Sequence, residues 1–191
     1  MMELLAILIS AILINNIVLM QFLGLCSFFG ISTNMKSVVG MGFAVIFVMT
    51  LAAAISYPIY YYVLEPLDIA YIETIAFILV IASLVQLTEL IIKRISKSLY
   101  KSLGIYLPLI ATNCAILGVA LKNVAEPKNY AEAMMFAIGS AIGFALVIII
   151  FTAIRIRLQA ATVPRSLKGL PIAFVTAGIM ALAFMGLVGI I

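Results

Sequence analysis

Long runs of apolar residues dominate the chain, and only short polar stretches separate them. Apolar residues make up 66% of the sequence and charged residues 9%, whereas soluble domains carry about 25% charged residues. A run of about 18 or more apolar residues can cross a bilayer, and it must be helical because lipid offers its backbone no hydrogen-bond partner. The sequence therefore predicts an all-α integral membrane protein with six transmembrane helices and no soluble domain. These segments are residues 4–23, 38–63, 72–92, 103–121, 133–154 and 170–190.

Positive charges are distributed unevenly between the two sides of this predicted bundle. Nine of the eleven Lys and Arg residues, all except Lys122 and Lys128, lie in the first, third and fifth connections. Because cytoplasmic connections are enriched in Lys and Arg, we expect these connections inside the cell and both termini outside. The same rule explains the net charge of +4, so binding to nucleic acid is not expected.

The only two cysteines occupy matching places in two similar stretches of ten residues. Cys26 is the sixth residue of QFLGLCSFFG, residues 21–30, and Cys114 is the sixth residue of LIATNCAILG, residues 109–118. Each stretch also ends in glycine. Shorter matches follow in the same order along the chain: MGFA at 41–44 with MMFA at 134–137, and IAF at 75–77 with IAF at 172–174.

These matches predict an internal repeat within one membrane domain, residues 1–191. Its first copy comprises three helices in residues 1–95, and its second copy comprises three helices in residues 96–191. An odd number of helices in each copy makes the second copy enter the membrane from the opposite face. The predicted fold is therefore an inverted 3+3 repeat, a class that places functional sites near the midplane on interrupted helices.

Glycine and proline near both cysteines predict that the first and fourth helices are interrupted. Gly24 and Gly30 flank Cys26, and Pro108 precedes Cys114. An unbroken first helix, rising about 1.5 Å per residue, would carry Cys26 beyond the depth of Cys114. Polar side chains are expected to satisfy the backbone groups that such breaks free, and the candidates are Asn15, Asn16, Gln21, Thr112 and Asn113.

Three interpretations of the cysteine pair follow from the residues alone. A buried free cysteine is most often a small apolar side chain, two cysteines in equivalent places could form a disulfide, and thiolates also bind zinc and iron–sulfur clusters. A [2Fe–2S] cluster needs four cysteines, or two cysteines and two histidines, and this chain has two cysteines and no histidine. A cluster would therefore require ligands from another chain. Asn113 is expected to satisfy broken-helix backbone or to donate toward a cluster sulfur.

Other patterns predict packing but no catalytic centre. Gly139-x-x-x-Gly143 is a small-residue motif typical of close helix contact. The sequence contains no phosphate-binding loop, dinucleotide fingerprint or hydrolase triad, and the absence of histidine removes the commonest general base. No catalytic residue is therefore expected in this chain.

Five stretches of the chain carry a resemblance to known proteins. They read INNIVLMQFLGLCSFFG, GIYLPLIATNCAILGVAL, MGFAVIFVMTLA, AFILVIASLVQLTEL and FVTAGIMALAFMG. These stretches resemble a family of membrane subunits that contains the A subunit of Rnf complexes and the E subunit of the sodium-pumping NADH:quinone reductase. Asn15-Asn16 and Thr112-Asn113-Cys114 are more similar to the Rnf member.

The resemblance implies a translocase subunit in the cytoplasmic (inner) membrane of a bacterium or archaeon. Such complexes couple ferredoxin:NAD oxidoreduction to Na⁺ or H⁺ transport. In this family the subunit pairs with an oppositely oriented homologue, the Rnf E subunit, and each supplies two cysteines to one intramembrane [2Fe–2S] cluster. Cys26 and Cys114 match these ligand positions, and Gly24 and Asn113 are expected to surround the cluster.

The resemblance also implies further partners, namely the B, C, D and G subunits of Rnf and the lipid bilayer. No covalent flavin is expected, because the threonine motif that attaches FMN in other subunits is not found here. Two alternatives stay open, the E subunit of the quinone reductase and a small inverted-repeat transporter without a redox cofactor. Iron–sulfur absorbance from the purified complex would favour a redox role, and substrate flux through colourless protein would favour a transporter.

Overall fold

A computed structural model describes residues 2–66, 70–95, 110, 112–126, 129–161, 164 and 167–188. In these ranges the chain is helical, with short connections and no strand. The elements in chain order are α1 (Met2–Ile9), η1 (Ser10–Ile14), α2 (Ile17–Gln21), α3 (Leu25–Ile31), α4 (Met35–Ile59), η2 (Tyr60–Leu64), η3 (Ala70–Ile72), α5 (Glu73–Ile95), α8 (Cys114–Ala125), α9 (Tyr130–Ala160) and α10 (Leu170–Val188).

The apolar helices overlap the segments that the sequence marks as membrane-spanning, and the described part of the chain is all-α, consistent with a membrane protein. Three of the described helices are long and apolar enough to cross a bilayer: Met35–Leu64, Glu73–Ile91 and Tyr130–Ala160. Three shorter apolar helices cover Leu4–Ile14, Cys114–Ala125 and Leu170–Gly186. The first part of the predicted fourth segment, 103–121, lies outside the described residues, so six complete spans stay a prediction.

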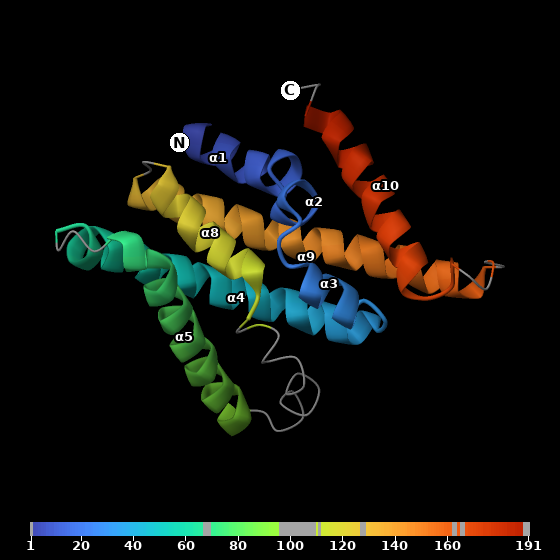
Figure 1. The fold of residues 1–191 in the computed structure, drawn as a ribbon, viewed down its shortest axis with the longest axis horizontal. Helices are drawn as coiled ribbons and strands as arrows, with labels where there is room; N and C mark the ends of the chain where they lie inside the picture. Colours follow the sequence, from blue (N-terminus) through green and yellow to red (C-terminus); the bar gives the residue numbers. More distant parts are fainter. Residues whose placement is uncertain are drawn as a thin grey trace.

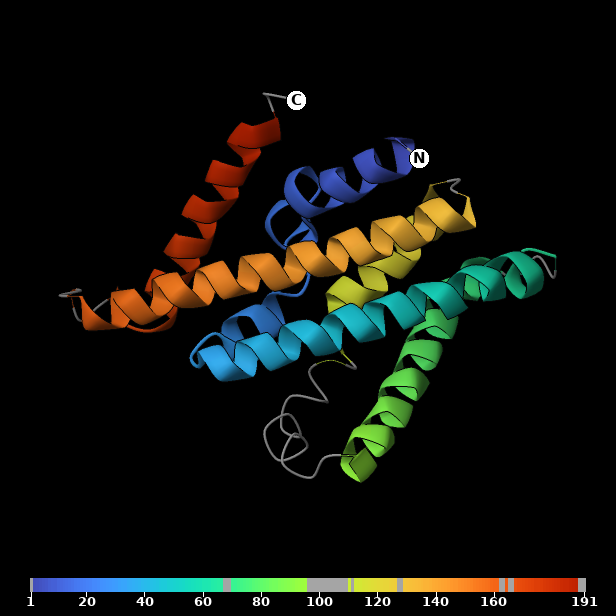
Figure 2. The same cartoon turned by 180° about the vertical axis from the view of Figure 1, so that it is seen from behind.

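Helices α4 and α9 form the centre of the molecule. They lie side by side and run in opposite directions (Figure 1 and Figure 2). A Cβ atom built on Gly42 of α4 would lie 3.2 Å from the Cβ atom of Ala145 on α9, so the two backbones approach closely there. The most apolar window of α9 is 61% buried within the chain, compared with 17% for α5. Helix α9 is therefore the core of the fold, and α5 mostly faces outward.

Helix α9 is longer at both ends than the predicted segment, 133–154. Its start is fixed by a capping box, in which Asn129 and Glu132 exchange hydrogen bonds between side chain and backbone. These polar residues lie before the apolar run, so hydropathy alone placed the start of the helix too late. At the other end the helix continues past Arg155 and Arg157 to Ala160.

The connections gather at two opposite ends of the α4–α9 pair. One end holds the start of α1, the end of α8 and the start of α9 (Figure 1). The other end holds the start of α4, the end of α9 and the start of α10. These elements carry Lys36 on α4 and Arg155 and Arg157 on α9, and Lys168 lies just before α10. Helices α5 and α10 leave the central pair from opposite ends and run in opposite directions. The first and fifth connections thus share one end, as the charge pattern predicts, whereas the third lies outside the described residues beyond Ile95.

The glycine motif of α9 lets the N-terminal helix lie close to it. A Cβ atom on Gly139 would be 2.8 Å from the Cβ of Ala11 and 3.0 Å from the carbonyl oxygen of Leu8. A Cβ atom on Gly143 would be 2.9 Å from Nδ2 of Asn16 and 3.0 Å from the carbonyl oxygen of Ile12. The motif therefore serves close helix packing, as its spacing predicts.

Replacing Gly143 by leucine is expected to lower stability. The new side chain would meet backbone that cannot rotate away, and overpacking of this kind costs about 1–3 kcal/mol. Gly178→Leu on α10 is the matched control, because a Cβ atom there meets nothing within 4 Å. Both changes raise helix propensity by a similar amount. A lower unfolding temperature of Gly143→Leu than of Gly178→Leu, measured in detergent, would therefore report the packing clash alone. Equal unfolding temperatures for the two variants would contradict the packing described for Gly143.

Candidate functional site

The first helical segment is broken at Asn15 and Asn16. The π-helical turn η1 ends when Asn15 N–H donates to the Ser10 carbonyl oxygen at 2.7 Å. The buried side chain of Asn16 accepts from Val18 N–H at 3.1 Å and donates to the Ile12 carbonyl oxygen at 3.2 Å. One asparagine thus satisfies a carbonyl of the helix that ends and an amide of the helix that begins, the role expected for polar residues at a break.

A second break follows six residues later, before Cys26. Phe22 and Gly24 both adopt left-handed backbone conformations, with φ of 55° and 85°. Helix α3 then starts at Leu25, so Cys26 lies in its first turn. The buried hydroxyl of Ser27 donates to the Gly24 carbonyl oxygen at 2.9 Å and holds this turn. The prediction of an interrupted first helix is confirmed.

Cys114 is the first residue of α8. The preceding Asn113 caps the helix, since its Oδ1 accepts from Ala115 N–H at 3.1 Å. The capping side chain is 2% exposed. Asn113 therefore satisfies freed backbone, as expected. Pro108, on which the predicted break of the fourth helix also depends, lies outside the described residues.

The two breaks meet at the cysteines. The Gly24 N–H donates to Sγ of Cys114 at 2.9 Å, across ninety residues of sequence. The Cys26 side chain also lies close enough to Cys114 to interact with it, and both are free thiols. A Cβ atom on Gly24 would lie 3.2 Å from Oδ1 of Asn113 and 3.0 Å from Cε2 of Phe144. The structure thus brings together Cys26, Cys114, Gly24 and Asn113, the four residues singled out from the sequence.

Hydrogen-bond donors surround Cys114. Its sulfur accepts a backbone N–H, and the residue is the first of a twelve-residue helix. Nδ2 of Asn113 is buried and has no hydrogen-bond partner among the described residues. Since a buried amide is normally paired, this N–H₂ group is a spare donor on the residue that directly precedes Cys114.

The site is open on one side and incomplete as a metal centre. Cys26 is exposed and Cys114 is half-buried. A hollow of about 260 Å³ borders Cys114 and Asn113 and is walled by Ile78 and Ile81 of α5. Among the described residues, no group of three or more His, Cys, Asp or Glu side chains could hold a metal ion. The chain therefore offers two thiols that a second molecule can approach.

Arg155 contributes to this region in a way that the sequence did not indicate. From α9 its Nη1 donates to the Phe29 carbonyl oxygen at 2.9 Å and to the Ser32 hydroxyl, and so caps the C-terminal end of α3. The sequence analysis assigned Arg155 no role beyond that of one positive charge in the fifth connection. No local pattern near Arg155 signals the contact, because its partners are more than 120 residues away.

These features define a multi-pass helical membrane protein whose broken helices meet at a pair of cysteines. Residues 4–191 match the family described as "Rnf-Nqr subunit, membrane protein". The chain belongs to this family, which confirms the resemblance seen in its sequence.

Relatives cover the chain from end to end. It is 55% identical over 188 residues to the A subunit of the Na(+)-translocating ferredoxin:NAD(+) oxidoreductase complex of Acetobacterium woodii, covering 98% of each chain. It is 55% identical to the A subunit of the ion-translocating oxidoreductase complex of Aeromonas salmonicida, over 100% of this chain and 99% of that one. The A subunit of the same kind of complex in Shewanella sediminis is 52% identical over the whole of both chains.

Gly24→Ala is expected to separate the two halves of the site. Alanine is strained at a left-handed φ by about 1–2 kcal/mol, and its Cβ would also press on Phe144 and Asn113. Gly169→Ala is the control, because Gly169 has a φ of 96° but open space around its Cβ position. Both variants should unfold at lower temperature, but only Gly24→Ala should raise the rate at which maleimide labels Cys114. Unchanged labelling in Gly24→Ala would contradict the contact.

Proposed function

We propose that this chain is the A subunit of an Rnf ion-translocating ferredoxin:NAD⁺ oxidoreductase and carries electrons within the membrane. Full-length similarity to chains that are named as the A subunit of such complexes supports the assignment. The observation that carries the electron-transfer role is the hydrogen bond from Gly24 to the Cys114 thiol, which holds the cysteines of two sequence halves together. In this role the chain is one part of a translocase that moves Na⁺ or H⁺.

The residues present fit one half of a [2Fe–2S] site. Cys26 and Cys114 are free, soft sulfur ligands of the kind that iron–sulfur clusters use. The Gly24 N–H donates to Cys114, and Asn113, which directly precedes Cys114, has a side-chain N–H₂ without a partner among the described residues. Donors to sulfur are a known control of cluster potential. When bound, such a cluster supplies one-electron transfer.

The missing ligands must come from a partner. A [2Fe–2S] cluster needs four cysteines or two cysteines and two histidines, and this chain has two cysteines and no histidine. A homologous, oppositely oriented chain, the Rnf E subunit, would present two further thiols. Because Cys26 is exposed whereas Cys114 is half-buried, the partner would approach from the side of Cys26.

The side chains of this protein set the environment of the site. Phe144 and Ala115 lie against Gly24 and exclude water from its inner side. Exclusion of water raises the cost of added charge, while the Gly24 N–H and the N-terminus of α8 lower it again at Cys114. These opposing effects would tune the site to gain and lose single electrons.

An inverted 3+3 repeat in the membrane accounts for the arrangement of the helices. The central helices of the two predicted copies, α4 and α9, run antiparallel, and the helices that follow them, α5 and α10, leave from opposite ends. The matched cysteines meet between the copies. With the positive charges facing inward, such a repeat would have the basic end of α9 in the cytoplasm and both termini outside.

Cys26→Ala and Cys114→Ala test the electron-transfer role. In the complex containing this chain, each variant should lose most of the intramembrane cluster iron and stop ferredoxin-to-NAD electron flow. The reason is that each variant removes one of the two thiol ligands that this chain supplies. Iron analysis, EPR of membranes and the electron-transfer rate measure these effects. Ser83→Ala is the control, since its exposed hydroxyl bonds only within α5. Full electron transfer in either cysteine variant would show that the cysteines are packing residues.

Asn113→Ser, studied in the same complex, separates the role of Asn113 in capping α8 from its role in setting the reduction potential of the cluster. Serine keeps an oxygen for the helix cap but has no amide N–H₂. The expected result is a retained cluster with a shifted reduction potential. A purely structural asparagine would leave the potential unchanged and alter only the yield.

The sidedness is tested by labelling introduced cysteines in a background without Cys26 and Cys114. Glu126→Cys, at the proposed outer end, should react with an impermeant maleimide in intact cells. Arg157→Cys, at the proposed cytoplasmic end, should react only after permeabilisation. Both side chains are exposed, so equal labelling after permeabilisation is the internal control. Labelling of Arg157→Cys alone in intact cells would reverse the proposed orientation.

A further inference from the structure

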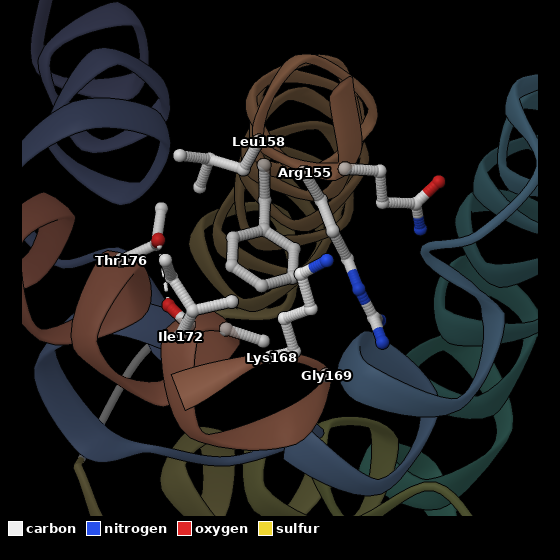
Figure 3. A pocket seen from close by; sticks show the side chains of 9 residues that line it. Arg155, Leu158, Lys168, Gly169, Ile172 and Thr176 are labelled. Atoms are coloured by element: carbon white, nitrogen blue, oxygen red, sulfur yellow. Dashed lines mark hydrogen bonds between the residues drawn. The ribbon is translucent and has the colours of Figure 1, made fainter. Parts of the chain in front are cut away.

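A cavity at the basic end of the molecule lies apart from the cysteine site. It has a volume of about 170 Å³ and lies between the end of α9 and the start of α10. Its inner wall is apolar, formed by Phe151, Ile172 and Ala173, and its rim carries Arg155 and Lys168. Figure 3 shows Arg155 and Lys168 reaching into the same space from the two sides, Arg155 from α9 and Lys168 from the turn before α10.

The two cations in this cavity have no anionic partner within the described part of the chain. The ion pair between Lys122 and Glu126 lies at the opposite end, where α8 ends. The hydrogen bonds that Arg155 makes with described residues both leave from Nη1, although a guanidinium carries five N–H donors. Two like charges that face one cavity repel each other, and an anion between them would remove this repulsion.

The backbone around Lys168 adds to the attraction for an anion. Gly169 has a φ of 96° and ends the turn that leads into α10, a helix of nineteen residues. The N–H groups of a helix N-terminus and its dipole favour phosphate. The cavity therefore combines two cations, a helix start and an apolar wall.

We propose that this cavity binds the phosphate headgroup of an anionic phospholipid. The phosphate would lie between Arg155 and Lys168, and an acyl chain would follow the apolar wall and the outward face of α10, where Phe174 and Val175 are exposed. Basic pockets between membrane helices are a recognised setting for anionic headgroups. A lipid fits better than free phosphate because the cavity joins a charged rim to an apolar interior at the end of a membrane helix. The bound lipid would connect α10 to α9 and so stabilise the same Arg155 that caps α3.

The test is lipid retention by the complex containing this chain, measured by native mass spectrometry from nanodiscs of phosphatidylglycerol or phosphatidylcholine. Lys168→Gln should weaken retention of phosphatidylglycerol by about fivefold, the effect of one cation near a headgroup. Lys168 is chosen because Arg155 also holds α3. Arg157→Gln is the control, since Arg157 is exposed on α9 and does not line the cavity. This variant should leave the retention of phosphatidylglycerol unchanged.

Three outcomes would overturn the proposal. Equal losses in Lys168→Gln and Arg157→Gln would mean that the lipid is held only by general surface charge. Displacement of phosphatidylglycerol by an equal concentration of inorganic phosphate would assign the site to free phosphate. Unchanged lipid retention in Lys168→Gln, together with loss of another protein from the complex, would assign the cations to a partner's carboxylate. Each of these results leaves the cysteine site and its electron-transfer role untouched.

Discussion

The fold depends on satisfying backbone hydrogen bonds where a membrane helix breaks. Lipid supplies no donors or acceptors, so a break is tolerated only where the protein supplies them. Asn16 and Asn113 do so at two breaks, through side-chain bonds to neighbouring backbone groups. At the third break, before Cys26, the Gly24 N–H donates to the Cys114 thiol. The same bond therefore satisfies the backbone and brings two potential ligands together.

Helix α9 holds the broken first segment at two places. Gly139 and Gly143 let α1 and η1 approach it closely, and Arg155 binds the far end of α3. Between these two anchors Gly24 lies against Phe144 of the same helix. A short, irregular segment is thus fixed without a long helix of its own, which leaves Cys26 on the surface where a partner can reach it.

The apolar segments, the break before Cys26 and the four site residues could be predicted from the sequence, because hydropathy, glycine spacing and the matching cysteine stretches are all local signals. Other features depend on tertiary contacts. The left-handed Phe22 has no turn residue to announce it. The early start of α9 depends on the polar capping pair Asn129 and Glu132, and the cap on α3 comes from distant Arg155. The inverted repeat itself was suggested by weak matches, and part of its second copy lies outside the described residues.

The central proposal, that Cys26 and Cys114 form half of a shared cluster site, is tested most directly by iron stoichiometry. The chain would be purified alone and after coexpression with its homologous partner, and iron would be counted and its state examined by Mössbauer spectroscopy. The expected result is little iron in the chain alone and about two irons per pair, the content of one [2Fe–2S] cluster. A full cluster in the chain alone, or an iron-free pair that still transfers electrons in the complete complex, would contradict it.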